Sequence, residues 1–242
     1  MNLAPTLALR LVHLDIDSGL PLSDDLASAV RAACDDVDDG PSPAVLLIRI
    51  RGTDATVAWP GDVRVNQVNR WEQAMNRLSR LAGVSVAVVS GGCGGLALEL
   101  LTAADHRIAA HDFRLDRLCA AGASWPGMAL HRLVHRQGPC AARRLFVFPA
   151  PLQAAQALQL GVIDEVAANA DEAADVFIEG LRGFDFAAVP ARRLLIAESQ
   201  QGTYEEVLGS HLAACDVELR RRAAAGNRAE GSGESSSKRA AA

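Results

Sequence analysis

The chain has 242 residues, 50% hydrophobic and 22% charged, which is enough for one sizeable core with peripheral elements. Its net charge is −5 and its pI is about 5.7, so no basic field indicates nucleic acid or an anionic membrane as a partner. The five cysteines are odd in number, widely spaced and never in CxxC, which argues against a disulfide framework and a zinc site. We expect a cytoplasmic protein without leader, membrane span or bound metal.

Strand and helix patterns alternate along the first half of the chain, which is typical of an α/β fold. Alternating apolar and polar residues predict a first strand, and Ser23 is placed to cap the helix that follows. The loop at 51–62 contains two large apolar residues and is a candidate wall of a site. The elements predicted here are strand 7–16, helix 24–34, strand 44–50, helix 65–81 and strand 84–90.

The second half continues the alternation and ends in two helical segments with apolar stripes, which we expect to contact another subunit. The last residues are small and polar and cannot bury enough area to offset their ordering entropy, so they are predicted to be disordered. The predicted domains are therefore a core at 1–189, C-terminal helices at 190–225 and a disordered tail at 226–242. The predicted elements are helix 96–104, strand 107–110, helices 128–136, 140–147 and 151–160, strand 162–166, and helices 172–181, 192–199 and 204–222.

The stretch from Val84 to Asp105 organises the chain: an apolar strand, the turn GGCGG, and a helix that is apolar nearly all round. Such a helix is predicted to be buried on most faces, and Glu99 is its one charged residue. The first N–H groups of the helix lack intrahelical partners and can stabilise developing negative charge beside the glycine turn. A carboxyl group and N–H donors would then share one site.

Two other interpretations stay open at this point. Residues 92–97 satisfy GxGxxA between a strand and a helix, and Asp112 ends the next strand, as in a dinucleotide-binding unit. Glu99 can also be explained without catalysis, because a carboxylate near a helix N-terminus gains about 0.3–1 kcal/mol from the helix dipole. The i, i+4 pair His131 and His135 has metal-compatible spacing but no adjacent Glu, which favours a structural pair.

The sequence VSVAVVSGGCGGLALELLTAADHRIAA resembles the signature of the crotonase (enoyl-CoA hydratase) superfamily. Three further stretches agree in order and spacing: IRIRGTDATVAWPGDV, with Asp62 at the Asp of the family's G-A-D, then SWPGMALHRLV, and then LFVFPAPLQAAQALQLGVIDEV. The match covers about Leu7 to Val166. It implies a repeated ββα spiral core of the crotonase type with a C-terminal helical layer.

The resemblance also implies roles for individual residues. It puts Glu99 on the first of the family's two catalytic glutamates, and the two oxyanion N–H groups on the backbones of Trp59 and Leu96. The second glutamate falls on Cys119, so the carboxylate pair is absent, and Gly95 and Cys119 are expected to contact substrate. Since the family's shared chemistry is stabilisation of a thioester enolate by two N–H donors, one carboxyl group can serve a single proton transfer.

The degenerate second site and the Arg-rich, Lys-poor composition are similar to one branch of the family, accessory crotonase-like proteins of dihydroxyphenylglycine biosynthesis. This similarity implies dehydration or aromatisation of a polyketide thioester toward dihydroxyphenylacetyl-CoA, with coenzyme A carried by the substrate and no other cofactor. It implies a type III polyketide synthase and a second crotonase-like protein as partners, and a homotrimer or hexamer. The alternative is a non-catalytic accessory subunit that assists the synthase.

Overall fold

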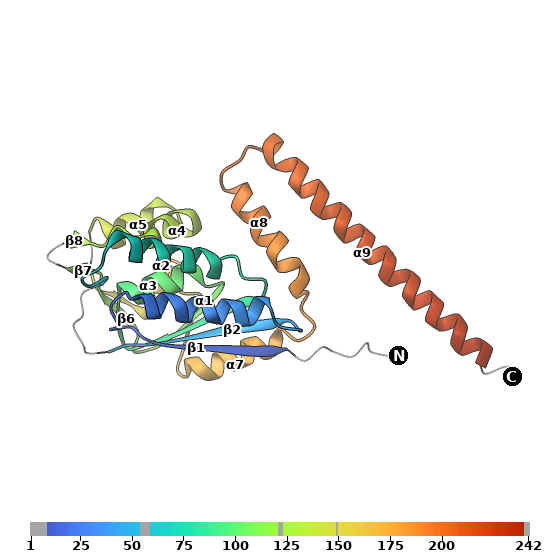
Figure 1. Ribbon diagram of the computed structural model, residues 1–242, viewed down its shortest axis with the longest axis horizontal. Coiled ribbons are helices and arrows are strands. Elements are labelled where there is room, and N and C mark those ends of the chain that lie inside the picture. Colours follow the sequence, from blue (N-terminus) through green and yellow to red (C-terminus); the bar gives the residue numbers. More distant parts are fainter. Residues whose placement is uncertain (1–8, 54–58, 121–122, 149, 240–242) are drawn as a thin grey trace. The chain divides into compact units, whose positions relative to one another are not determined.

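The computed structural model describes residues 9–53, 59–120, 123–148 and 150–239 (Figure 1). Internal contacts divide the chain into two units, 1–189 and 190–242. The strands of the first unit are β1 (Arg10–Asp17), β2 (Ala44–Arg51), β3 (Val84–Ser90), β4 (Gly92–Gly94), β5 (His106–Ala110), β6 (Arg114–Arg117), β7 (Cys119–Ala120), β8 (Ala123–Ser124), β9 (Leu152–Gln153) and β10 (Glu165–Ala167). Its helices are α1 (Asp24–Asp38), α2 (Val65–Leu78), α3 (Gly95–Ala103), α4 (Met128–Gln137), α5 (Pro139–Phe146), α6 (Ala154–Gln159) and α7 (Ala170–Gly180), with a 3₁₀ turn at Phe186–Ala188.

A five-stranded sheet in the order β1-β2-β3-β5-β10 forms the centre of the first unit, and all its neighbouring strands are parallel. A smaller sheet has the order β4-β6-β9, and β7 pairs with β8. Twice the chain passes from the large sheet to the small sheet and then into a helix, as β3-β4-α3 and as β5-β6 before α4. The predicted α/β class with repeated ββα units is confirmed.

Both faces of the large sheet are buried, which explains why its central strands are almost continuously apolar. Along β2, Leu46 and Ile48 belong to the core on the side of α1, α2 and α3, whereas Val45 and Leu47 belong to a second cluster with residues of α7. Figure 1 shows α7 on the opposite face of the sheet from those three helices.

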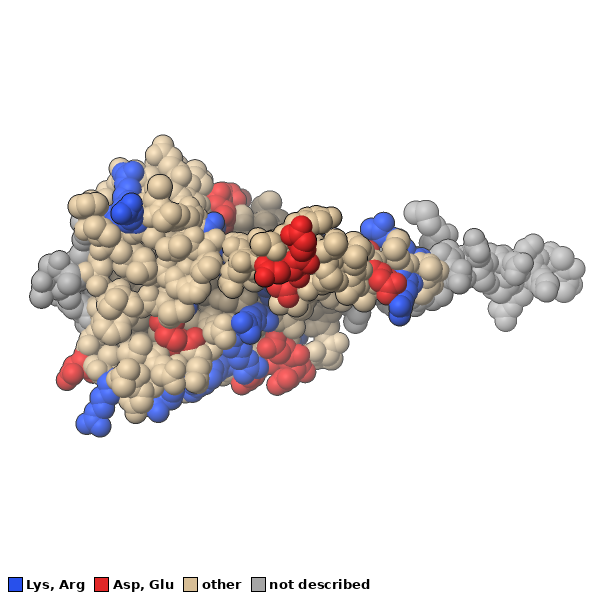
Figure 2. Space-filling view, turned by 90° about the horizontal axis from the view of Figure 1, so that it is seen from above, with Lys and Arg blue, Asp and Glu red and all other residues tan. Residues whose placement is uncertain are grey.

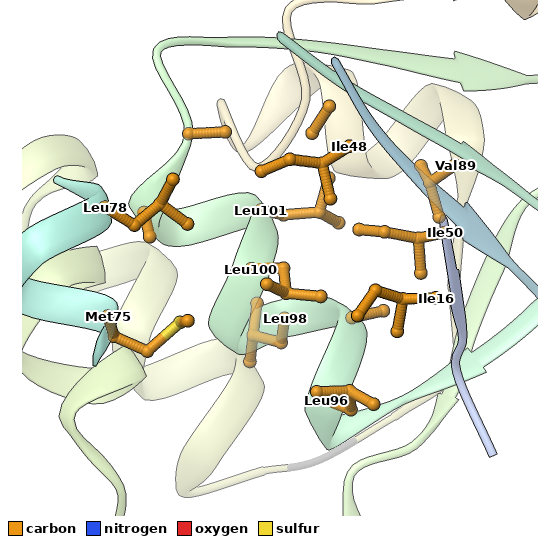
Figure 3. Packing of buried hydrophobic residues seen from close by; sticks show 14 of the residues in the cluster. Ile16, Ile48, Ile50, Met75, Leu78, Val89, Leu96, Leu98, Leu100 and Leu101 are labelled. Carbon is orange, nitrogen blue, oxygen red and sulfur yellow. The ribbon is translucent and has the colours of Figure 1, made fainter. Parts of the chain in front are cut away.

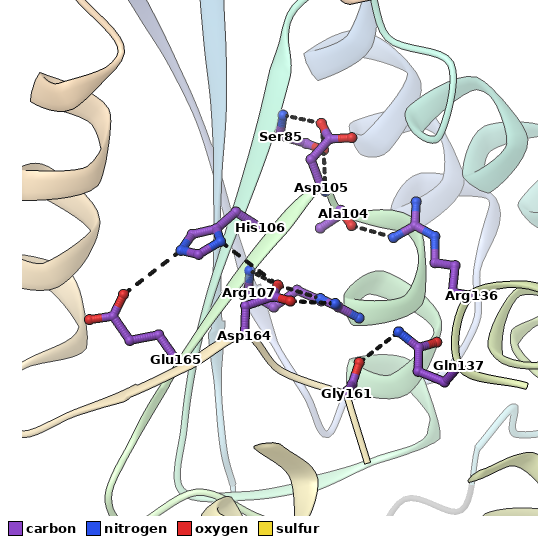
Figure 4. Close-up of polar contacts among 10 residues, drawn as sticks. All are labelled: Ser85, Ala104, Asp105, His106, Arg107, Arg136, Gln137, Gly161, Asp164 and Glu165. Carbon is purple, nitrogen blue, oxygen red and sulfur yellow. Dashed lines mark hydrogen bonds and ion pairs between the residues drawn. The ribbon is translucent and has the colours of Figure 1, made fainter. Parts of the chain in front are cut away.

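Helix α3 runs through the larger core, and its residues from Leu96 to Ala103 are all buried, which confirms the expectation from its apolar surface. Figure 3 shows its leucines between β1 and β2 on one side and Met75 and Leu78 of α2 on the other. A buried helix end needs partners for its last carbonyl groups. Arg136 of α4 supplies them, since its guanidinium donates to the backbone oxygen of Ala103 and to that of Ala104, the second of which Figure 4 shows.

Carboxylates at the starts of the strands fix the frame behind α3. Asp105, the Asp of the predicted family signature, accepts from the backbone N–H and the hydroxyl of Ser85, each at 2.8 Å (Figure 4). Asp164 accepts from the backbone N–H and from two guanidinium nitrogens of Arg107 at 2.7–2.9 Å. Both carboxylates are structural, because all these bonds tie adjacent strand ends together.

The local predictions that depend on capping and periodicity hold. Ser23 is the N-cap of α1 and its hydroxyl accepts from the N–H of Leu26 at 3.1 Å, as predicted. The short strands β4, β6, β7, β8 and β9 were not predicted, because segments of two to four residues are too short to show a period of two. Strand β9 takes the first residues of the helix predicted at 151–160, and α6 begins only at Ala154.

The second unit contains α8 (Val189–Ser199) and α9 (Tyr204–Arg239). Large apolar residues of these helices are exposed, including Leu194 at 57% and Leu212 at 59%, and their burial against another subunit stays a prediction. Helix α9 continues to Arg239, and the disordered tail predicted from residue 226 stays a prediction.

Charges of both signs are interspersed on the face that Figure 2 shows, and most of that surface is uncharged. No extended field of one sign is visible there on the described residues. Within the described part of the chain, every helix is too short or too polar to cross a membrane.

Candidate active site

Glu99 lies in the second turn of α3 with 2% of its surface exposed. At this exposure water cannot solvate its charge well. A buried carboxylate needs a partner, and none is close in the sequence. Its partner comes from α4, thirty-three positions further along the chain.

Arg132 of α4 forms a hydrogen-bonded ion pair with Oε2 of Glu99. The other terminal nitrogen of the same guanidinium donates to Oε2 of Glu72 on α2 at 3.2 Å, and its Nε donates to the hydroxyl of Thr102 at 3.2 Å. Oε1 of Glu72 accepts from the backbone N–H of Met128 at 3.1 Å. One guanidinium therefore holds two carboxyl groups from different helices, and we call this set the Glu72–Arg132–Glu99 triad.

Burial raises the pKa of Glu99 from an ordinary 4.5 to about 7. Arg132 and a backbone hydrogen bond from Ala129 lower that pKa, and the charge of Glu72 raises it, but the loss of hydration is the largest effect. A carboxyl group with a pKa near 7 is suited to both accepting and donating a proton at neutral pH. The helix dipole alone does not explain this pKa, because a helix N-terminus lowers the pKa of a carboxyl group, whereas the pKa of Glu99 is raised.

Gly127, just before α4, leaves room for the second oxygen of Glu99. A Cβ atom at this position would clash with Oε1 of Glu99 and would lie 2.8 Å from both Cδ1 and Nε1 of Trp125. Oε1 of Glu99 and the indole N–H edge of Trp125 therefore share the space in front of this glycine. The oxygen of Glu99 that is not paired with Arg132 is the one beside Trp125.

The loop of Trp59 meets the glycine turn at Gly95, the first residue of α3. A Cβ atom at Gly95 would lie 2.5 Å from Cδ1 of Trp59, so only glycine allows this approach. Leu96 follows within the first turn of α3, where backbone N–H groups have no intrahelical acceptor, and the N-cap Gly94 has no side chain to provide one. The loop and the turn converge, and the assignment of the Trp59 and Leu96 N–H groups as oxyanion donors stays a prediction.

Cys119 begins β7, and its side chain lies outside the described part of the structure, as does the candidate wall residue Val57. Asp62 is exposed. Sequence analysis missed Arg132 and Glu72: the first lies within SWPGMALHRLV, whereas a lone Glu on α2 carries no sequence signal.

The dinucleotide interpretation does not fit the structure. Residues 92–94 of the GxGxxA segment form strand β4 in the smaller sheet, so the strand is not followed directly by a turn and a helix. The carboxylate of Asp112 accepts from the N–H of Gly91 at 3.2 Å. It therefore holds the turn itself, whereas in a dinucleotide-binding unit the carboxylate at this place accepts from the ribose hydroxyl groups. His131 and His135 pack ring to ring at 4.1 Å, and the described residues contain no cluster of three or more metal ligands.

Comparison with known proteins decides the family. No protein-family profile matches the sequence. A protein of Amycolatopsis orientalis named enoyl-CoA-hydratase is 35% identical over 210 residues, which cover 87% of this chain and 96% of that protein. The chain belongs to the crotonase (enoyl-CoA hydratase) superfamily.

Solved structures agree with the crotonase fold. An enoyl-CoA hydratase of Mycobacterium smegmatis superposes with a TM-score of 0.74 at 18% identity, over 89% of this chain and 91% of that one. An enoyl-CoA hydratase of Shewanella pealeana gives 0.73 at 18% identity, over 88% and 87%. A putative enoyl-CoA hydratase/isomerase family protein of Hyphomonas neptunium gives 0.66 at 22% identity, over 86% and 87%. At these identities the likeness concerns the fold.

Proposed function

We propose that this crotonase processes an acyl thioester of coenzyme A with Glu99 as its acid/base. The observation that carries the proposal is a buried carboxyl group of raised pKa, about 7, at the helix that follows the glycine turn. The backbone N–H groups of Trp59 and Leu96 would hold the thioester oxygen as negative charge develops on it. The name of the Amycolatopsis orientalis relative supports the same substrate class.

One carboxyl group is sufficient for a dehydration. The carboxylate of Glu99 takes the proton from the carbon next to the thioester, and the electron pair of that C–H bond moves into the enolate. The enolate then expels the hydroxyl group from the neighbouring carbon and forms the double bond. The same carboxyl group returns its proton to the departing hydroxyl, which leaves as water. Oε1 is the oxygen for this task, since Oε2 is bound to Arg132.

The specific reaction we propose is dehydration or aromatisation of a polyketide thioester toward dihydroxyphenylacetyl-CoA, in cooperation with a type III polyketide synthase. Cys119, in place of the second family glutamate, favours a reaction other than ordinary hydration of simple enoyl thioesters. Repeated loss of water from a polyketide needs one shuttling carboxyl group and an enolate site, which fits the single carboxyl group at 99.

A second candidate is a non-catalytic accessory subunit of the synthase. The ion pair of Glu99 with Arg132 favours it, because a carboxylate fixed by a guanidinium can be a purely structural element of a core. The missing carboxyl group at Cys119 points the same way.

Mass spectrometry of thioester products, formed by a type III polyketide synthase with and without this protein, tests the proposed function. We expect a new dehydrated or aromatic CoA thioester, 18 Da lighter for each water lost, only when the protein is present. An unchanged product set whose total yield rises would instead support the accessory role. No effect on product identity or yield would contradict both candidates.

Gly127→Ala tests the space in front of Glu99. The new methyl group must displace Oε1 of Glu99 or the ring of Trp125, so we expect thioester conversion to fall about 10–100-fold, with a loss of stability of about 1–3 kcal/mol. Gly180→Ala is the matched control, since a Cβ atom there meets nothing within 4 Å. Equal activities of the two variants would show that Glu99 does not need this geometry.

A further inference from the structure

The Glu72–Arg132–Glu99 triad contains two carboxyl groups and one cation, so one negative charge stays uncompensated when both acids are ionised. Its side chains are largely closed to water, with 18% of Glu72, 14% of Arg132 and 3% of Glu99 exposed. His131 of α4 also lies near the triad, but burial lowers its pKa below the ordinary 6.5, as do the charges of His135 and Arg132. At neutral pH His131 therefore supplies no second cation, and one bound proton is what neutralises the triad.

The two carboxyl groups of the triad are held in the same way but are buried to different degrees. Each pairs with Arg132. Glu72 also accepts from the N–H of Met128, the first residue of α4, and Glu99 accepts from the N–H of Ala129, the next residue. Because Glu99 is the more deeply buried, the loss of hydration penalises its charge more. The proton therefore goes to Glu99, and Glu72 keeps the negative charge.

The single guanidinium of Arg132 is divided between the two acids. After burial, the largest effects on the pKa of Glu99 come from Arg132, which lowers it, and from the charge of Glu72, which raises it. Without the charge of Glu72, Arg132 would neutralise Glu99 alone and hold it as a carboxylate. A carboxylate held in this way is a weak base at neutral pH. The base strength of Glu99 therefore depends on the residue with which it shares its cation.

We propose that Glu72 is a positioning residue that keeps Glu99 able to exchange a proton, because it shares Arg132 and so prevents the guanidinium from fixing Glu99 as a carboxylate. Glu72 acts on Glu99 through α4 and needs no contact with substrate. The inference rests on the proposed function, in which Glu99 is the acid/base. It adds the residue that sets the pH range in which this acid/base works.

Infrared titration of the full-length protein tests the proposal without substrate or turnover. A protonated carboxyl group has a C=O stretching band that a carboxylate lacks, and the titrating band that is missing in Glu99→Gln belongs to Glu99. In the wild type we expect this band to have its midpoint at about pH 7. In Glu72→Gln, which keeps the volume but removes the charge, the midpoint should lie about 1 pH unit lower. An unchanged or higher midpoint would overturn the proposal.

Three further variants show whether the charge of Glu72 is the cause. Glu72→Asp keeps the charge and should move the midpoint by less than about 0.5 pH unit. Glu72→Met removes the charge with an apolar side chain and should give the same lower midpoint as Glu72→Gln, which keeps the test decisive if the amide variant does not fold. Asp24→Asn is the matched control, because it removes an exposed carboxylate that pairs with Arg70 of α2 at 2.7 Å. Its midpoint should change by less than about 0.2 pH unit, and a shift there equal to that of Glu72→Gln would overturn the assignment.

The pH dependence of turnover gives a second measurement, with the polyketide thioester that the type III polyketide synthase supplies. In Glu72→Gln the acid limb of the pH–rate profile should move to lower pH together with the infrared midpoint. The maximal rate should fall about 2–10-fold, because a carboxyl group that loses its proton more readily is a weaker base. A purely structural residue would lower the rate by the same factor at every pH, and that result would overturn the role of Glu72.

Failure of this inference differs from failure of the proposed function. If Glu99→Gln is inactive while Glu72→Gln keeps the wild-type midpoint and pH profile, the proposed function stands and the role of Glu72 is wrong. If the midpoint moves in Glu72→Gln but thioester conversion does not depend on Glu99, the coupling of the two carboxyl groups stands and the proposed function is wrong.

Discussion

The Glu99→Gln variant is expected to fold and to convert the thioester about 10²–10⁴-fold more slowly than the wild type. Glutamine keeps the volume and can still accept a hydrogen bond from Arg132, but it cannot take or return a proton. The measurement is the initial rate of thioester conversion at pH 7, with circular dichroism as the folding check. Glu165→Gln, at a half-exposed carboxyl group on β10, is the control and should change the rate less than about 2-fold.

The same variant has an expected signature in stability. The pKa of Glu99 is about 7 in the folded protein and 4.5 when unperturbed, so the folded state binds the proton more tightly. This stabilisation is fully present below about pH 4.5 and is lost as the pH rises through 7, which lowers the free energy of unfolding by about 3 kcal/mol. Glu99→Gln should remove this pH dependence in urea unfolding. It should also be more stable than the wild type at pH 8.

An accessory protein would give the opposite result in the activity assay. Its contribution would come from surface contacts, so the buried substitution would leave the enhancement of product formation nearly unchanged. A folded Glu99→Gln variant that supports full product formation would therefore eliminate the catalytic assignment and favour the accessory role.

Replacing Arg132 by methionine is expected to destabilise the protein by about 3–5 kcal/mol, because Glu99 and Glu72 would face each other with no cation between them. Arg132 lowers the pKa of Glu99, so its removal should raise that pKa above 7. Protonation of Glu99 relieves part of the penalty at low pH, and the loss should be larger at pH 8 than at pH 5.5. Any activity that needs the Glu99 carboxylate should shift to higher pH.

Two variants make this result specific. Arg77 also lies between two carboxylates, Asp35 and Asp38, but its side chain is 38% exposed. Arg77→Met should therefore lower the free energy of unfolding by no more than about 1 kcal/mol. In the double variant Arg132→Met with Glu99→Gln, the uncompensated buried charge is gone, and most of the lost stability should return. Equal losses at Arg132 and Arg77, or no recovery in the double variant, would show that the triad does not act as a buried charge network.

The central part of the site could be predicted because its determinants are contiguous. The strand, the glycine turn and the helix with Glu99 lie within 84–105, and each follows from local periodicity, glycine content and helix propensity. The same applies to the cap at Ser23. Asp112 shows the limit of such patterns, since its spacing fits a ribose contact while its carboxylate in fact holds the turn at Gly91.

The sequence by itself thus determined the α/β alternation, the burial of α3 and the position of its carboxyl group, because these depend on interactions between residues a few positions apart. Only the tertiary structure decided what surrounds that carboxyl group. Arg132 reaches Glu99 across 33 positions and Glu72 across 60, and Trp59 meets Gly95 only in the folded chain. Such pairs leave no periodic pattern in the sequence. Two effects bring them together: separate helices and loops pack against one another, and a charge that the core has removed from water needs a partner.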